Sequence, residues 1–70
     1  MRKEIHYPHA RFTLVLDSKN KAFVLYAVNK VFSVVADKQF DNEVDFKEAV
    51  RSLKSKLQNL NDKIKELKNA

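Results

Sequence analysis

The sequence predicts a small α+β domain in which one N-terminal strand, residues 11–17, is followed by two helices, 18–37 and 45–68. Three patterns lead to this prediction. Polar and apolar side chains alternate over 11–17, which is typical of a half-buried strand. Apolar side chains recur at helical spacing over 18–37, and over 46–67 they recur at steps of three and four. A single strand leaves its own backbone hydrogen-bonding groups unpaired, so it must pair either with the short stretch 4–7 or with the same strand of a second copy. We favour the second copy and therefore expect a dimer.

The chain has 70 residues and no cysteine. We expect a single domain over 11–70, preceded by an arm or a short edge strand over 1–10. So short a chain buries only about 60% of its unfolded surface, and disulfides cannot compensate, so oligomerisation is the common remaining way to enlarge the core. The lack of cysteine and of a signal peptide predicts a cytoplasmic location. The apolar runs are too short to cross a bilayer, so a membrane partner is not expected.

The strand at 11–17 has two unlike faces, because successive side chains of a strand point in opposite directions. The apolar face carries Phe12, Leu14 and Leu16. The opposite face, which we expect to meet solvent or a partner, carries Arg11, Thr13 and Val15.

Residues 18–37 admit two interpretations. Their valines and phenylalanines favour strands, and two strands joined by a turn at Asn29-Lys30 would give a three-stranded antiparallel meander plus one long C-terminal helix. The helical period favours a helix, because the apolar side chains fill an arc of roughly 200°. Strands at 22–28 and 31–36 would also be apolar on both faces and would need covering layers that a short chain lacks. We therefore predict a helix and keep the meander as the alternative.

The segment 45–68 has the clearest helical pattern. Its apolar stripe consists of Phe46, Val50, Leu53, Leu57, Leu60, Ile64 and Leu67. Lysines flank the stripe, so two copies paired through it would place lysine against lysine. The pattern leaves three partners open for this stripe and its lysine rims: the first helix, an acidic helix of another protein, and a phosphate backbone.

The net charge of +5 indicates attraction to polyanions or acidic proteins. Few groups suggest catalysis or metal binding. The pair His6 and His9 is interrupted by Pro8 and lacks further ligands, and the serines have no neighbouring His–Asp arrangement. A 70-residue chain also has little room to enclose a small molecule. We expect no enzyme activity, cofactor, metal or small-molecule substrate.

The order Arg11-x-Thr13-x-x-Leu16-Asp17, followed by two predicted helices, resembles the ribbon-helix-helix family of DNA-binding repressors. This resemblance implies that the strands of two subunits pair antiparallel and enter the major groove. It implies base contacts from Arg11, Thr13 and Val15. It also implies that the start of the second helix, around Asn42, lies near a phosphate.

We therefore predict a small basic protein that binds DNA as a homodimer and acts as a transcriptional repressor. The expected DNA-binding residues are Arg11, Thr13, Val15, Asn42, Lys47 and Lys54. The alternative is a protein-interaction module, such as an inhibitor or assembly factor, that docks its long helix on an acidic protein. The residues expected to bind that partner are Lys56, Lys63, Lys68, Leu57, Leu60 and Ile64.

Overall fold

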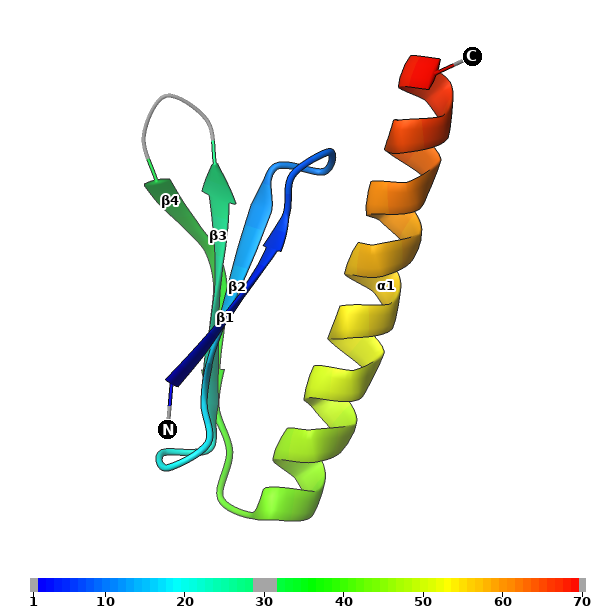
Figure 1. Ribbon diagram of the computed structural model, residues 1–70. Helices are drawn as coiled ribbons and strands as arrows, with labels where there is room; N and C mark the ends of the chain where they lie inside the picture. The colour runs from blue at the N-terminus through cyan, green and yellow to red at the C-terminus, as the bar shows by residue number, and fades with distance from the viewer. Residues whose placement is uncertain (1, 29–31, 70) are drawn as a thin grey trace.

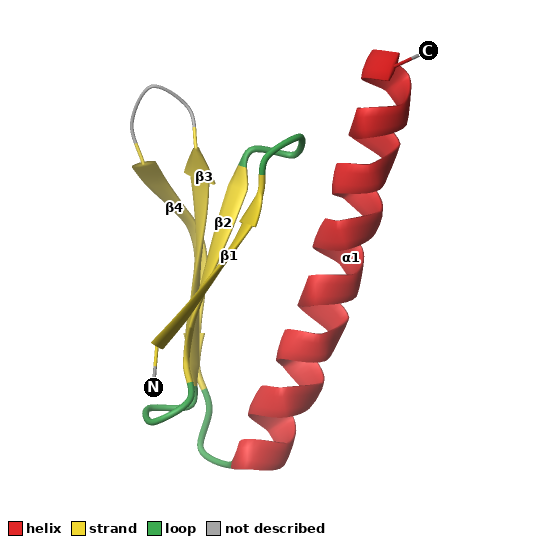
Figure 2. Ribbon diagram, viewed as in Figure 1, coloured by secondary structure: helices red, strands yellow, loops and turns green. Residues whose placement is uncertain are grey.

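The computed structural model describes residues 2–28 and 32–69 (Figure 1). Its elements are β1 (Arg2–Tyr7), β2 (Phe12–Asp17), β3 (Ala22–Val28), β4 (Phe32–Gln39) and α1 (Glu43–Asn69). The strands form one antiparallel sheet in the order β1-β2-β3-β4. The single helix α1 lies along one face of the sheet, so the molecule has two layers (Figures 1 and 2).

The predicted order of one strand and two helices is wrong at 18–37, where the chain forms β3 and β4. The observed fold fits the alternative, a meander followed by a long helix, with β1 as a fourth strand. The turn that the alternative placed at Asn29-Lys30 lies outside the described residues. The strands that seemed to need two covering layers do not have them: α1 lies along one face of the sheet (Figure 1), and residues 33–39 of β4 are exposed on both faces, with 58% of Val34 exposed.

The register of the sheet places the core side chains on one face. Ile5, Leu14 and Leu25 lie directly opposite one another on β1, β2 and β3. Leu14, on the inner strand β2, has no exposed surface. The buried cluster between sheet and helix consists of Tyr7, Leu14, Leu25 and Leu57. Burial raises the pKa of the Tyr7 hydroxyl. A single row of β-sheet side chains therefore forms the centre of a small core.

Two aromatic contacts attach the beginning of α1 to the sheet. The ring centroids of Phe23 and Phe40 lie 6.1 Å apart, and those of Phe40 and Phe46 are also separated by 6.1 Å. The Lys38 ammonium group lies 4.9 Å from the Phe40 ring centroid. Phe40 thus joins the end of the sheet to the first turn of the helix, because it contacts a ring on each.

A second attachment lies near the other end of α1. Asn61 is only 8% exposed, and its Oδ1 accepts hydrogen bonds from the backbone N–H groups of His9 (2.8 Å) and Ala10 (3.1 Å). These two amides belong to the turn between β1 and β2. A buried amide oxygen therefore holds this turn against the helix and satisfies two backbone donors at once.

The tight turns are made without glycine, which the chain lacks. Arg11 and Lys21 take the left-handed conformation instead, with φ of 59° and 53°. In the second of these turns, Asp17 accepts hydrogen bonds from the side chain (2.7 Å) and the backbone N–H (3.2 Å) of Asn20. Both hydrogen bonds lower the pKa of the Asp17 carboxyl, and the bond from the Asn20 side chain has the larger effect. Polar side chains therefore stabilise this turn, in which no glycine is present.

Candidate nucleic-acid interface

The sheet has no place for the predicted intersubunit ribbon. β2 pairs with β1 along one edge, from Phe12 to Asp17, and with β3 along the other edge over the same residues. Both rows of its backbone hydrogen-bonding groups are therefore occupied within the chain. The expectation that this strand pairs with its copy in a second subunit and enters the major groove is wrong for that reason.

Thr13 and Val15 lie on the sheet face that points away from α1, as the alternation of β2 requires. They are nevertheless only 4% and 7% exposed, because β2 is an inner strand with neighbours on both sides. Thr13 is further engaged by a hydrogen bond of 3.1 Å between its Oγ1 and Nδ1 of His6 on β1. Neither side chain stands free to reach a base edge.

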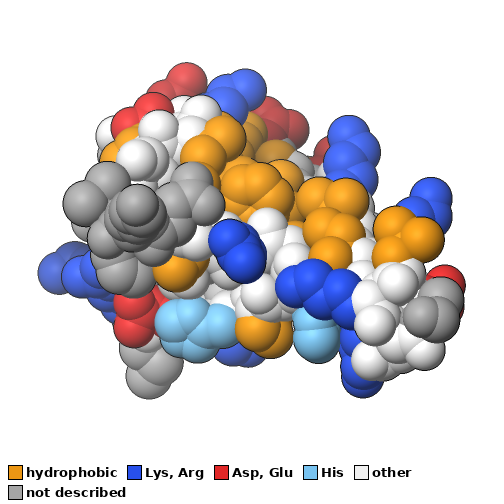
Figure 3. Space-filling model, turned by 90° about the horizontal axis from the view of Figure 1, so that it is seen from above, with side chains coloured by type: hydrophobic (Ala, Val, Ile, Leu, Met, Phe, Trp, Pro, Cys, Tyr) orange, Lys and Arg blue, Asp and Glu red, His pale blue; other side chains and the backbone are white. Residues whose placement is uncertain are grey.

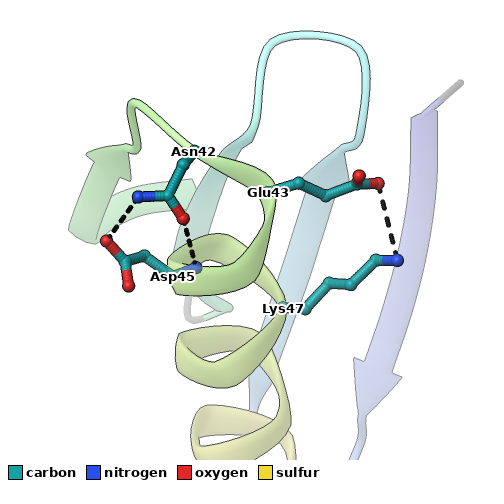
Figure 4. Close-up of polar contacts among 4 residues, drawn as sticks. All are labelled: Asn42, Glu43, Asp45 and Lys47. Atoms are coloured by element: carbon teal, nitrogen blue, oxygen red, sulfur yellow. Dashed lines mark hydrogen bonds and ion pairs between the residues drawn. The ribbon is translucent and has the colours of Figure 1, made fainter.

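The predicted phosphate contact at Asn42 has a different local role. Its Oδ1 accepts a hydrogen bond from the backbone N–H of Asp45 (2.8 Å), and its Nδ2 donates to Asp45 Oδ2 (2.8 Å), as Figure 4 shows. Asn42 is thus the N-cap of α1. Arg11, also predicted to bind DNA, lies in the β1–β2 turn, where its carbonyl accepts a hydrogen bond from Val28 N (2.8 Å). Arg11 and Asn42 therefore stand at separate turns.

The cations of α1 are concentrated on one side of the helix. Positions four and three residues apart share one side of a helix. One such row, here called the basic stripe, consists of Lys47, Arg51, Lys54, Gln58, Asn61, Lys65 and Lys68. Five of its seven members are cations, and it contains no carboxylate. The basic stripe therefore carries two groups of cations, Lys47 to Lys54 and Lys65 to Lys68, separated by Gln58 and Asn61.

The adjoining outer row of α1 has the opposite character. It consists of Glu48, Ser52, Ser55, Asn59, Asp62, Glu66 and Asn69. None of these residues is a cation, and all of them are exposed. Most of the positive charge of α1 therefore lies on the side of the basic stripe.

The basic stripe lies on the side of α1 that faces β1. Asn61, a member of the stripe, binds the β1–β2 turn, and Figure 4 shows Lys47 extending toward the side on which β1 lies. Lys47 pairs with Glu43 at 3.5 Å, but both side chains are more than 60% exposed, so this pair adds little and leaves Lys47 available. Lys54 is half-buried.

The residues predicted to bind an acidic protein do not form one surface. Leu57 is 5% exposed in the core, Ile64 is half-buried, and Lys68 belongs to the basic stripe. The remaining three, Lys56, Leu60 and Lys63, lie on the opposite edge of α1. This edge, which also includes Leu53 and Leu67, is here called the Leu–Lys edge. Leu60 and Leu67 are 41% and 76% exposed. Figure 3 shows hydrophobic side chains gathered at the centre of the upper end of the molecule, with lysine and arginine side chains around them.

Comparison with known proteins identifies no relative: no family model, curated protein sequence or solved structure matches the chain. The resemblance to ribbon-helix-helix repressors therefore stays untested by comparison. Within residues 2–28 and 32–69, no helix is long and apolar enough to cross a membrane. Over the same residues, no three His, Asp or Glu side chains gather into a metal-binding group.

The sequence contained the signal for the basic stripe, although the prediction included only part of it. Lys47 and Lys54 were selected for DNA, and Lys68 was assigned to the other surface. Arg51 and Lys65 were missed, even though they continue the same steps of three and four. The helical period, applied to the charged residues as well as to the apolar ones, predicts the whole row.

Proposed function

We propose that this protein binds nucleic acid, with DNA as the first candidate, through phosphate contacts made by the basic stripe of α1. The observation that supports this proposal is that five of the seven cations of α1 lie on one side of this 27-residue helix, where the nearest carboxylate is Glu43, which pairs with Lys47. Phosphate contacts by Lys and Arg supply most of the affinity of non-specific DNA binding. The net charge of +5 acts in the same direction.

The length of the basic stripe suits a nucleic-acid duplex. From Lys47 to Lys68 the helix rises about 32 Å, at about 1.5 Å per residue. This is close to one turn of B-DNA, which is about 34–36 Å. The cations fall into two groups separated by Gln58 and Asn61, so they can contact phosphates at two separate places along a duplex.

We expect binding with little sequence preference. The side chains predicted to contact bases are either buried, as Thr13 and Val15 are, or placed at a turn, as Arg11 is. Phosphate contacts position a protein on DNA and carry no direct sequence information. We therefore propose that the protein binds DNA in the cytoplasm and does not act as a sequence-specific repressor.

The test is a fluorescence anisotropy titration of a duplex of about 20 base pairs at several salt concentrations from about 50 to about 200 mM. The variant K47Q/K54Q/K65Q removes three charges of the basic stripe. Because each phosphate contact contributes about 0.9 to the slope of log K against log salt, we expect the slope to fall by about 3 in this variant.

The matched control is K19Q/K56Q/K63Q, which removes three lysines that lie outside the basic stripe. Its salt slope should stay close to that of the unchanged protein. Circular dichroism of both variants establishes that they remain folded. The proposal fails if the unchanged protein does not bind at about 50 mM salt, or if the control loses as much of the slope as the stripe variant.

The Leu–Lys edge supports a second candidate, an acidic protein partner. The exposed Leu60 and Leu67 alternate along the helix with Lys56 and Lys63, so apolar contact and positive charge occur on one edge. Such an edge fits an amphipathic acidic helix in a helix-in-groove contact. Binding to such a partner would be lost in K56Q/K63Q and kept in K47Q/K54Q/K65Q. For DNA binding we expect the opposite response to these substitutions.

A further inference from the structure

We propose that Lys3 on β1 belongs to the same phosphate-binding surface as the basic stripe of α1, so that the nucleic acid lies across both elements. This inference rests on the proposed function and extends its site from one element to two. β1 is the strand in closest contact with α1, and the turn that follows it binds Asn61 of the basic stripe. Figure 4 shows Lys47 on the side of α1 where β1 lies. The basic stripe and β1 are therefore neighbours.

The direction of the Lys3 side chain follows from the register of β1. Ile5 and Tyr7 face α1, because Ile5 lies opposite the buried Leu14 and Tyr7 belongs to the core cluster. Side chains two residues apart in a strand share one face, so Lys3 also lies on the side that faces α1. Tyr7 is buried, Ile5 is half-buried and Lys3 is exposed. The cover that α1 gives to β1 therefore decreases toward the start of the strand, where Lys3 is open to solvent.

The two sides of β1 differ in charge. The side that faces α1 has Lys3 as its only charged residue. The opposite side carries both Arg2 and Glu4, and Arg2 also lies opposite Asp17 on β2. Arg2 thus lies among carboxylates, whereas no carboxylate of β1 shares a side with Lys3. The unbalanced positive charge of this strand is therefore on the side of the basic stripe.

Lys3 lies at the level of the first group of cations of α1. The end of β1 is held beside Asn61, and from there the strand extends back along the first half of the helix (Figure 1). From Tyr7 back to Lys3 the strand covers about 13 Å, which corresponds to about nine residues of a helix. This distance brings Lys3 to the level of the group from Lys47 to Lys54.

The charge at this level of the molecule is complementary to a phosphate backbone. Of the cations Lys3, Lys47, Arg51 and Lys54, only Lys47 has an ion pair over the described residues, with Glu43 at 3.5 Å. Cations that gather without counter-charges repel one another, and a bound polyanion removes this repulsion. DNA carries one negative charge per about 1.7 Å of its axis, so a single stretch of duplex can contact cations on both elements. We therefore expect Lys3 to contribute to binding and not to the stability of the fold.

The experiment repeats the anisotropy titration from about 50 to about 200 mM salt with the variant K3Q, for which the slope of log K against log salt should fall by about 1. The first matched control is R2Q, which removes the neighbouring charge from the other side of β1. The second is K38Q, because Lys38 lies in the same row and on the same face of the sheet, but on the opposite edge strand β4. Both controls should change the slope by less than about 0.3.

A second measurement locates the DNA directly. The chain has no cysteine, so the variants K3C and R2C each carry a single thiol. A saturating concentration of duplex should slow the alkylation of K3C by iodoacetamide several-fold, because the bound DNA covers this side of β1. The alkylation of R2C, on the other side, should keep its rate.

The inference is overturned if K3Q lowers the salt slope no more than R2Q does, or if DNA protects K3C and R2C equally. It is also overturned if K3Q unfolds at a clearly lower urea concentration than R2Q, since Lys3 would then have a structural role. If K47Q/K54Q/K65Q still lowers the slope in these cases, the proposed function stands with a site confined to α1. If the unchanged protein does not bind DNA at about 50 mM salt, the proposed function and this inference both fail.

Discussion

At the scale of single residues, Asn61 determines how the β1–β2 turn meets the helix. It occupies a position next to the apolar stripe of α1, yet it is buried, because two backbone amides of the turn donate to its side-chain oxygen. Arg11 in the same turn takes a left-handed conformation, which costs a non-glycine residue about 1 kcal/mol or more. The contacts of Asn61 help offset such a cost.

We expect Asn61→Ala to lower the free energy of unfolding by about 2–3 kcal/mol, because it leaves the amides of His9 and Ala10 buried without an acceptor. Urea denaturation followed by circular dichroism measures this change. Asn61→Asp keeps an oxygen acceptor at the same place and should lose clearly less. Equal losses in the two variants would show that the amide bonds do not hold the turn.

At the scale of elements, α1 combines an ordered start with separated charges. Glu43 and Asp45 lie in its first turn and Lys68 in its last, where each sign is favourable to the helix dipole. The Asn42 cap satisfies one of the first backbone donors. The helix is thus stabilised at its ends by short polar contacts, which leaves the lysines along its length available for a ligand.

We expect Asn42→Ala to lower the free energy of unfolding by about 1 kcal/mol, because alanine cannot accept the hydrogen bond from Asp45 N. Asn42→Ser restores an acceptor and should recover most of the loss. Thermal or urea denaturation measures both variants. DNA affinity should be the same in both folded variants, and a large loss of affinity would return Asn42 to the phosphate-binding role that the sequence suggested.

At the scale of the whole molecule, the core is thin. The helix covers one sheet face, and the aromatic cluster and Asn61 attach it at its two ends. Leu14 on β2 is fully buried between the layers, whereas Leu60 and Leu67 on α1 remain exposed. A chain of this size has a small free energy of unfolding, so each side chain at the centre of the core contributes a large part of it.

We expect Leu14→Ala to lower the free energy of unfolding by about 3 kcal/mol or more, through lost burial and the cavity that remains. Leu67→Ala removes the same atoms from a position that is 76% exposed and should change stability by less than about 0.5 kcal/mol. Urea denaturation of the two variants compares them directly. Similar losses would mean that Leu67 is covered in solution, for example by a partner.

The main error of the sequence analysis lay at 18–37. Helical spacing and strand propensity conflicted there, and the helix was favoured because strands apolar on both faces seemed to need two covering layers. In the structure Leu25 on β3 is buried on the side that faces α1, whereas residues 33–39 of β4 are exposed on both faces. The prediction of a helix was wrong because one chain need not cover all of its own apolar surface.

The sequence by itself determined the long C-terminal helix and the strand over Phe12–Asp17, because both periods are local and unambiguous. It also contained the basic stripe, since helical spacing alone sorts those charges. Only the tertiary structure decided which strands pair with β2, and with that it removed the intersubunit ribbon. Strand pairing depends on contacts between residues distant in the chain, which local periodicity does not specify.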